Sequence, residues 1–396
     1  MRPLFATSFS LASSLGRGVL PTLEALRSAS GGLRRNDFPG SILDTWIGRV
    51  EGIETSTPAA RADGFSDYRV QRVAHAALAE DDFGTAVARA RETHGAKRIG
   101  VFLGTSSSGM LEGELAYRSR KPEGEALPAG LNYRDSINMY APAAYVRARL
   151  ALEGPACVVS TACSSGAKVF ATASRAIESG LCDAAVVGGV ETLCFTTLHG
   201  FASLELLSRE PCRPCDAERA GISLGEGAAF VLLEKTDVAG ERLALLGYGE
   251  SADAHHMSTP HPEGLGAALA MRAALERAGL APADIGYINL HGTGTRSNDA
   301  AEDAGVFSVM GDRVPVSGTK GWTGHTLGAA GAIEAVLTLL CLRHGYTPGT
   351  LNTRSVDPGL RTQVLLQGRD APLEHAMSNS FGFGGNNCSL VFGRPR

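Results

Sequence analysis

Short apolar runs alternate with amphipathic segments along most of the chain, and each apolar run leads into a polar turn. This alternation predicts an α/β fold in which helices cover layered sheets. In the first part of the chain, strands are expected over residues 5–11, 97–103, 156–160, 183–188 and 227–233, with helices over 21–27 and 164–179. In the second part, strands are expected over 242–249, 285–290 and 315–318, with helices over 264–279 and 327–342.

Both parts place a polar turn between a buried strand and a helix that begins with small residues. The turn covers residues 160–166 in the first part and 318–325 in the second. The repetition predicts an internal duplication with halves at 1–238 and 239–396. The glycine pair 188–189 is expected to end its strand.

Composition and charge exclude several classes of function. The chain has 37 Lys and Arg against 41 Asp and Glu, a net charge of −4, and no dense basic run that would bind nucleic acid. No stretch approaches the roughly 20 apolar residues of a membrane span. Residues 1–35 are rich in Arg and Ser, as transit peptides are, but the pattern also predicts a first strand and helix there. A cytoplasmic protein is expected.

The eight cysteines are scattered through the chain, mostly inside apolar segments. This distribution indicates reduced thiols and not a disulfide framework. Cys212 and Cys215 form a single Cys-x-x-Cys, but a structural zinc site needs a second pair or nearby histidines. No metal site is therefore expected.

Cys163 lies between an apolar strand and a helix rich in Ala, Ser and Gly. A position at the helix N-terminus is expected to lower the pKa of its thiol and to supply N–H donors to an oxyanion. The alternative is a buried, inert core cysteine.

Two histidines occupy similar turns. His291 directly follows the expected strand 285–290, at the end where ligands bind in open α/β sheets, and His325 lies in the turn of the second half. Lys320 precedes His325 on the same turn, and Glu302, on the helix after His291, is a candidate partner for this lysine. Residues 380–387 form a glycine-rich segment with two phenylalanines, which suits a lid over an apolar acyl pocket better than a phosphate cradle.

Together these segments resemble the β-ketoacyl-[acyl-carrier-protein] synthases, the elongating Cys-His-His condensing enzymes of the thiolase fold. The resemblance extends over essentially the whole chain. It implies two thiolase-like halves in an α-β-α-β-α layering, the first carrying the cysteine and the second both histidines. The motifs that carry it are Ser160-Thr-Ala-Cys163, His291-Gly-Thr-Gly-Thr295, Lys320 to His325 with Leu327-Gly-Ala-Ala-Gly331, Asn379-Ser-Phe-Gly-Phe-Gly-Gly385, and Asp216-Ala-Glu-Arg219 with Gly225-Glu-Gly227.

The resemblance implies a decarboxylative Claisen condensation. Cys163 would take an acyl group from a carrier-protein thioester, malonyl-carrier protein would lose CO2, and its enolate would attack the acyl group. His291 and His325 would donate to the enolate oxygen, and the N–H groups of Cys163 and Phe383 would form the oxyanion hole. No metal, nicotinamide or flavin cofactor is implied.

Further roles follow from the same resemblance. Phe383 would act as the acyl gate on a loop with Gly382, Gly384 and Gly385, and Lys320 with Glu302 would be a supporting charged pair. The partners implied are acyl carrier protein and a second ketosynthase-like subunit, in a homodimer or heterodimer, with residues 193–207 a candidate for the acyl tunnel or interface.

Some residues depart from the family pattern. Trp322 stands where smaller residues are usual, so a different pocket shape is expected. The basic carrier-docking cluster is reduced to Arg61, which leaves Arg69 or Arg72 as replacements. We expect a specialised pathway, such as polyene synthesis. Two alternatives stay open, namely a thiolase-fold enzyme that uses coenzyme A thioesters and a catalytically silent partner of the chain-length-factor type.

Overall fold

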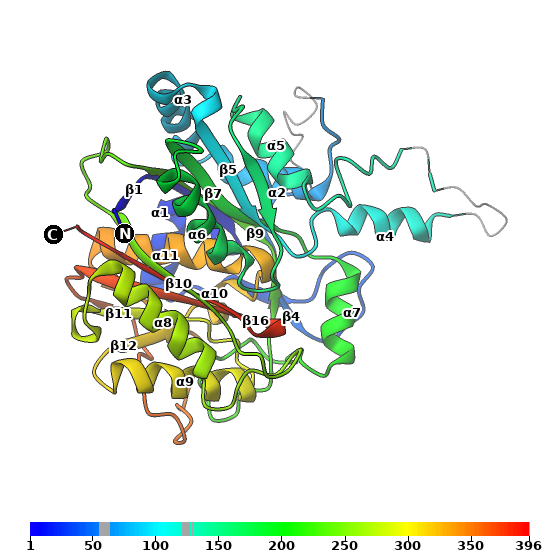
Figure 1. Ribbon diagram of the computed structural model, residues 1–396. Helices are drawn as coiled ribbons and strands as arrows, with labels where there is room; N and C mark the ends of the chain where they lie inside the picture. The colour runs from blue at the N-terminus through cyan, green and yellow to red at the C-terminus, as the bar shows by residue number, and fades with distance from the viewer. Residues whose placement is uncertain (55–63, 121–126, 129, 396) are drawn as a thin grey trace.

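A continuous sheet runs through the protein and is built from two similar halves (Figure 1). The computed structural model describes residues 1–54, 64–120, 127–128 and 130–395. Within these residues the strand order is β14-β12-β11-β16-β17-β10-β1-β9-β7-β5-β6. The strands of the first half are β1 (Leu4–Ser13), β5 (Ile99–Gly104), β6 (Ala156–Val159), β7 (Ala184–Glu191) and β9 (Gly227–Glu234). Those of the second half are β10 (Ala244–Ala252), β11 (Tyr287–Leu290), β12 (Pro315–Gly318), β14 (Gln363–Val364), β16 (His375–Gly382) and β17 (Asn386–Gly393).

The two halves share one pairing pattern. In the order β1-β9-β7-β5-β6 the first two pairs are antiparallel and the last two are parallel. The order β10-β17-β16-β11-β12 repeats this sequence of pairings. The halves meet where β1 and β10 pair over only two positions, Leu4 with Leu245 and Phe5 with Ala244. The predicted boundary at 238/239 falls in the connection between β9 and β10.

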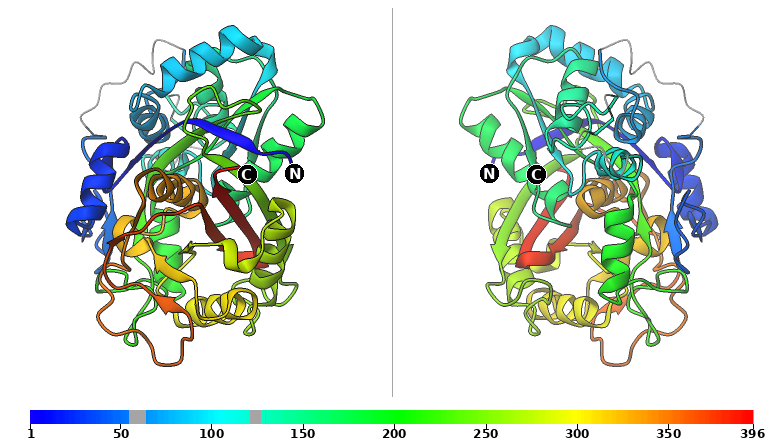
Figure 2. Two further views of the ribbon diagram at one scale, coloured as in Figure 1. Left: turned by 90° about the vertical axis from the view of Figure 1, so that its left-hand side faces the viewer. Right: turned by 90° about the vertical axis from the view of Figure 1, so that its right-hand side faces the viewer.

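The two halves of the sheet form two layers. Helices cover the outer face of each layer and fill the space between the layers, which gives the α-β-α-β-α arrangement (Figures 1 and 2). One outer layer contains α2 (Arg69–Leu78), α3 (Phe83–His94) and α5 (Ala141–Arg149), and the other contains α8 (Leu265–Ala278) and α9 (Arg296–Met310). The central layer contains α6 (Ser165–Glu178) and α11 (Ala330–His344), while α1 (Val19–Ser28), α4 (Met110–Arg118) and α7 (Phe195–Ser203) lie at the periphery.

The two central helices touch through glycines near their first turns. A Cβ on Gly166 would lie 2.8 Å from the backbone nitrogen of Ala332, and a Cβ on Gly331 would lie 2.6 Å from that of Ala167. Only residues without a side chain allow this approach. The crossing brings the N-termini of α6 and α11 together in the middle of the molecule, each at the end of a polar turn.

Most expected elements form close to their expected bounds, and the N-terminal segment is a strand and a helix, β1 and α1. The end predicted for strand 183–188 is wrong, because β7 continues through the glycine pair to Glu191. These glycines serve close packing: a Cβ on Gly188 would collide with the carbonyl oxygen of Ala229, and one on Gly189 would lie 2.8 Å from Ala329 Cα.

Among the residues that the structure describes, the helical segment Leu327–His344 is long and apolar enough by composition to cross a membrane. It forms part of the central layer, where 89% of the segment is buried inside the protein. Its apolar composition is therefore explained by packing between the two sheets.

Candidate active site

Cys163 lies on a sharp turn between β6 and α6. Ala162 adopts the left-handed conformation with φ of 53°, and α6 begins two residues after the cysteine. Such a conformation is costly for a residue with a side chain and is found where a turn must present its neighbour in a fixed direction. The turn presents the Cys163 sulfur to a buried space, and the residue is only 6% exposed.

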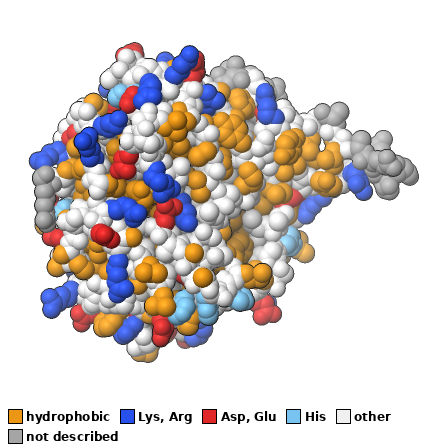
Figure 3. Space-filling model, in the orientation of Figure 1, with side chains coloured by type: hydrophobic (Ala, Val, Ile, Leu, Met, Phe, Trp, Pro, Cys, Tyr) orange, Lys and Arg blue, Asp and Glu red, His pale blue; other side chains and the backbone are white. Residues whose placement is uncertain are grey.

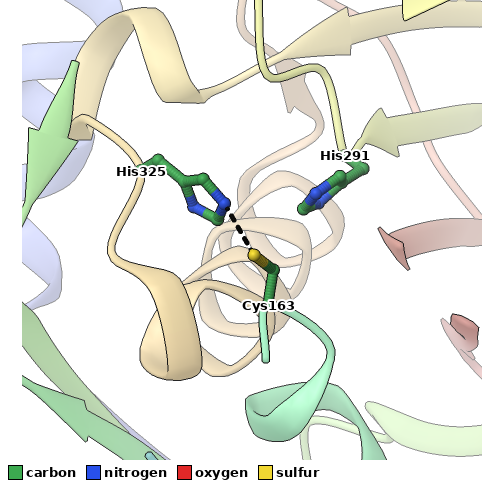
Figure 4. A group of neighbouring side chains, drawn as sticks. All are labelled: Cys163, His291 and His325. Carbon is green, nitrogen blue, oxygen red and sulfur yellow. Dashed lines mark hydrogen bonds between the residues drawn. The ribbon is translucent and has the colours of Figure 1, made fainter. Parts of the chain in front are cut away.

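His325 points its outer ring nitrogen at this sulfur (Figure 4). The distance from His325 Nε2 to Cys163 Sγ is 3.0 Å. The Leu327 N–H donates to His325 Nδ1 at 3.3 Å, so Nδ1 is an acceptor and the neutral ring carries its proton on Nε2. His325 therefore presents an N–H donor to the sulfur.

His291 faces the same sulfur from the end of β11 (Figure 4). Lys320 Nζ donates to His291 Nδ1 at 3.2 Å and also to the His291 carbonyl oxygen. Because Nδ1 accepts from an ammonium, the proton of the neutral ring again lies on Nε2. The sulfur and one nitrogen of each histidine lie within 4.8 Å of one another.

Two of the predicted site residues are not paired as expected. The partner of Lys320 is Glu334 on α11, at 2.5 Å, and both side chains are buried. Glu302 instead accepts the backbone N–H groups of His291 and Gly292, each at 2.8 Å. The predicted Lys320–Glu302 ion pair is therefore wrong, because Glu302 is already occupied in holding the turn that carries His291.

Glu334 was not anticipated from the sequence. It lies on a helix whose other residues from Ala330 to Leu342 are small or apolar, apart from Thr338. A single acid in such a run is a recognisable signal, since buried carboxylates are rarely found without a partner. Lys320 lies fourteen residues before it in the chain.

Burial dominates the titration of the site. It raises the pKa of the Cys163 thiol to about 11, although Lys320 and the Phe383 N–H, which donates to the sulfur, act to lower it. The expected net lowering of this pKa is therefore wrong for the resting site. Burial also moves the pKa of both histidines well below 6.5, helped by the charge of Lys320. Both rings are thus neutral donors at physiological pH.

Cysteine and histidine are also metal ligands, and the three side chains are close enough to share an ion. The buried ammonium of Lys320, however, contacts one of these histidines directly. A cation in that position opposes a dication and favours an oxyanion, so the group fits an acyl oxygen better than a metal.

A cavity of about 200 Å³ opens in front of the three side chains. Phe383 lines it, and its ring lies 5.9 Å from that of Phe201 on α7. Phe383 begins the tight connection Phe383–Gly385 between β16 and β17, in which Gly384 and Gly385 have positive φ. The cavity is also lined by Leu204, Leu206, Ile222, Thr293, Thr295, Ser258, Phe381, Gly382 and Gly385.

Trp322 and the Cys-x-x-Cys pair lie away from this cavity. Trp322 is 2% exposed, its Nε1–H donates to the Gly349 carbonyl oxygen at 2.9 Å, and it is not among the residues that line this cavity, so a different pocket shape stays a prediction that Trp322 does not support through direct contact. Cys212 and Cys215 are buried free thiols. Burial raises the pKa of Cys212 to about 12 and also raises that of Cys215 well above its usual range.

The arginines considered for carrier docking are engaged elsewhere. Arg69 donates to Glu226 and Glu54 at 2.6–2.8 Å and is largely buried. Arg72 is paired with Asp67 at 2.7 Å. Arg61 lies outside the described residues. Arg69 serves an internal ion-pair network, which is a poor basis for a docking surface.

The fold and the site together define a Cys-His-His condensing enzyme of the thiolase type. Two family models match the chain, "Beta-ketoacyl synthase, N-terminal domain" over residues 34–239 and "Beta-ketoacyl synthase, C-terminal domain" over 243–354. The chain belongs to the β-ketoacyl synthase family, and it is an elongating β-ketoacyl-[acyl-carrier-protein] synthase.

Relatives and solved structures agree with this assignment. The chain is 33% identical to the 3-oxoacyl-[acyl-carrier-protein] synthase 2 of Vibrio cholerae, with 99% of each protein covered. It is 40% identical to the mitochondrial synthase of Arabidopsis thaliana over 63% of this chain and 58% of that one. It also resembles a ketosynthase in complex with its chain length factor from Xenorhabdus doucetiae, with TM-score 0.89, 38% identity, and coverage of 99% and 98%.

Proposed function

We propose that Cys163 is the nucleophile of the condensation and that His291 and His325 are its two electrostatic donors. The observation that carries the proposal is the convergence of two Nε2–H groups on one sulfur. A silent partner subunit needs no such arrangement. A thiolase would need a second cysteine in place of one histidine.

In the first step the sulfur attacks the thioester carbonyl of an acyl-carrier protein. The bond between acyl carbon and carrier sulfur breaks, and the proton lost by Cys163 ends on the released carrier thiol. The negative charge of the tetrahedral intermediate is stabilised by the N–H groups of Cys163 and Phe383. Because the resting thiol is neutral, its proton leaves only as the carrier thioester arrives, and the thiolate is stabilised by the His325 Nε2–H and the α6 N-terminus.

In the second step malonyl-carrier protein enters the same cavity. Its carbon–carboxylate bond breaks, CO2 leaves, and the electron pair forms an enolate whose oxygen accepts from the two Nε2–H groups. The enolate carbon attacks the acyl group, and the Cys163 sulfur leaves as a thiolate that regains a proton from solvent. Neutral histidines suit this step because they donate without holding a full charge near the leaving carboxylate.

A second subunit is proposed along β6. Within the described residues β6 pairs only with β5, its four residues are half-buried, and its other edge ends the sheet. Hydrophobic side chains gather on the face over α4 and α5 (Figure 3), where Leu115 and Tyr117 are 49% and 61% exposed. An open edge beside apolar surface favours pairing with another chain.

The proposed partner is a related subunit of the chain-length-factor type. The Xenorhabdus doucetiae structure contains such a partner, and a second similar structure, 28% identical with TM-score 0.88, is the ishigamide ketosynthase/chain length factor. On the same basis we propose a specialised pathway that builds polyketide or polyene chains. A cytoplasmic location stays a prediction.

Reconstitution tests the proposal. The chain, alone and with a candidate partner subunit, is supplied with acyl- and malonyl-carrier protein, and products are followed by mass spectrometry. The proposal expects CO2 release and one two-carbon extension per malonyl consumed, with a defined length limit only when the partner is present. Saturated elongation by the chain alone would contradict the heterodimer and pathway proposals and retain the condensation.

A further inference from the structure

The carboxylate of Glu191 is fully buried at the end of β7, close to the site but without a role in the mechanism above. Its Oε2 accepts the N–H groups of Ser106 at 2.7 Å and Gly328 at 2.9 Å, and its Oε1 accepts the Ser107 N–H at 2.9 Å. The hydroxyls of both serines also donate to it. Among the described ion pairs none joins Glu191 to a Lys, Arg or His. The charge is thus balanced by dipoles alone.

The duplication shows what this carboxylate replaces. Glu191 ends β7 opposite the first residue of β9, as Gly382 ends β16 opposite the first residue of β17. Cys163 and Gly328 likewise correspond, since each stands two residues before its central helix. Each follows a left-handed residue, Ala162 with φ of 53° or Leu327 with φ of 45°. Glu191 therefore occupies the same position relative to Gly328 in one half of the duplication as Gly382 occupies relative to Cys163 in the other.

The two turns are treated differently. At the turn before α6, a Cβ on Gly382 would lie 3.2 Å from the Cys163 nitrogen. The glycine therefore keeps this side of the turn open, where the oxyanion hole is proposed. At the turn before α11, a carboxylate oxygen of Glu191 occupies the corresponding place and accepts the Gly328 N–H. Because this side chain accepts from three backbone N–H groups and three hydroxyls, the turn has no free N–H on this side to offer a ligand.

The fixed turn controls His325. The Leu327 N–H, which donates to His325 Nδ1, and the Gly328 N–H, which donates to Glu191, lie on either side of the Leu327 backbone. Holding one N–H therefore fixes the direction of the other. We propose that Glu191 is a positioning residue that maintains the Leu327–Gly328 turn, and thereby the Nε2–H tautomer of His325 that faces Cys163. The functional consequence rests on the proposed function, whereas the effect on the tautomer does not.

The test compares Glu191→Gln and Glu191→Asp with the wild type. The tautomer of His325 is measured by 15N NMR of histidine-labelled protein, assigned with a His325→Asn variant, in the absence of any acyl substrate. The proposal expects His325 in the Nε2–H form in the wild type and a mixture of tautomers in both variants. It further expects acyl transfer from acyl-carrier protein to slow about 10- to 100-fold in kcat with little change in KM, as for a misplaced catalytic group.

Glu234→Gln is the matched control, because Glu234 is a buried glutamate that ends β9 opposite the first residue of β7, at the other end of these strands from Glu191, and bonds to Thr7 and His94. It is expected to lose stability and leave the His325 tautomer and kcat unchanged. If Glu191→Gln does not fold, Ser107→Ala removes one donor to the same carboxylate and is expected to give a smaller tautomer shift. An unchanged His325 tautomer in the variant that folds would overturn the inference. Failure of acyl transfer in the wild type would instead count against the proposed function alone.

Discussion

The two halves of this protein use one scaffold for opposite purposes. The loop after β5 carries Thr105, Ser106 and Ser107, whose donors surround Glu191. The corresponding loop after β11 begins with His291, which faces Cys163 across an open cavity. The same strand ends thus build a closed, fully satisfied polar cluster in one half and a reactive site in the other. The comparison teaches that the strand ends of the first half form a rigid support around Glu191, whereas those of the second half leave space for substrate in front of Cys163.

Removing either histidine should have the largest effect. His291→Ala and His325→Ala each remove one of two donors to the enolate oxygen, so we expect condensation to slow by about 10²- to 10³-fold. Acylation of Cys163 should be affected more by His325→Ala, because only that ring bonds to the sulfur in the resting site. Steady-state condensation and single-turnover acylation check this, with His344→Ala as a control outside the site. Equal effects on both steps by both variants would contradict the division of roles.

Breaking the buried ion pair should affect stability strongly. Lys320→Met leaves the Glu334 carboxylate buried without its cation, and we expect a loss of about 3–5 kcal/mol in the free energy of unfolding. Lys320→Met with Glu334→Leu should recover most of this loss but not the condensation rate, because His291 Nδ1 still lacks its donor. Urea unfolding and condensation assays separate the two quantities. Recovery of activity together with stability would show that Lys320 has no role in the site.

The corresponding turn glycines should respond differently to a methyl group. A Cβ on Gly328 would collide with the backbone of Ser106 and Thr105 and with Glu191, so Gly328→Ala should cost about 3 kcal/mol. A Cβ on Gly382 meets neighbours only at 3.0–3.2 Å, so Gly382→Ala should cost about 1 kcal/mol and mainly slow acylation at the crowded sulfur. Thermal unfolding and acylation rates check the contrast, and equal losses of stability would contradict it.

Acid should destabilise the protein through the two buried histidines. Their folded pKa values lie well below 6.5, so below pH 6.5 the unfolded chain binds protons that the folded chain does not. Each histidine then lowers the free energy of unfolding by up to about 1.4 kcal/mol per pH unit. The pKa values of Glu302 and Glu334 are raised to about 7, so between pH 7 and 4.5 their protonation increases the free energy of unfolding as the pH falls. This contribution is the same in a histidine variant and in the wild type, and it cancels when the two are compared.

The matching measurement is urea unfolding of His325→Asn and wild type at pH 6.5 and 5.5. The variant is expected to lose roughly 1 kcal/mol less over this interval, because the unfolded histidine is already half protonated at pH 6.5. The same loss in both proteins would mean that His325 is protonated in the folded state.

The sequence allowed the elements and the three side chains that meet in the cavity to be predicted because each depends on local pattern. Apolar runs mark the buried strands, and small residues mark the central helices. The ends of β7 and the partner of Lys320 depended instead on contacts between distant segments. Gly188 resembles a turn signal until Ala229 is known to lie against it. That Lys320 pairs with Glu334 and not with Glu302 becomes apparent only when the position of α11 in the fold is known.

The pKa of Cys163 was misjudged for a related physical reason. A helix N-terminus lowers a thiol pKa, and this effect can be inferred from sequence. The opposing cost of complete burial is a property of the folded surroundings, and here it is the larger of the two. Glu191 could not be singled out from the sequence for a similar reason, because its donors come from two segments, residues 105–107 and Gly328, that are far apart in the chain.

The central claim is that Cys163 carries the acyl group. Intact-mass spectrometry of the chain, mixed with an acyl-carrier-protein thioester in the presence of its partner subunit, tests this most directly. We predict that the wild type gains the mass of one acyl group, while Cys163→Ala gains none and Cys182→Ala, another buried free thiol, behaves as the wild type. An acyl adduct on Cys163→Ala equal to that on the wild type, or no adduct on the wild type from any acyl length, would contradict the account.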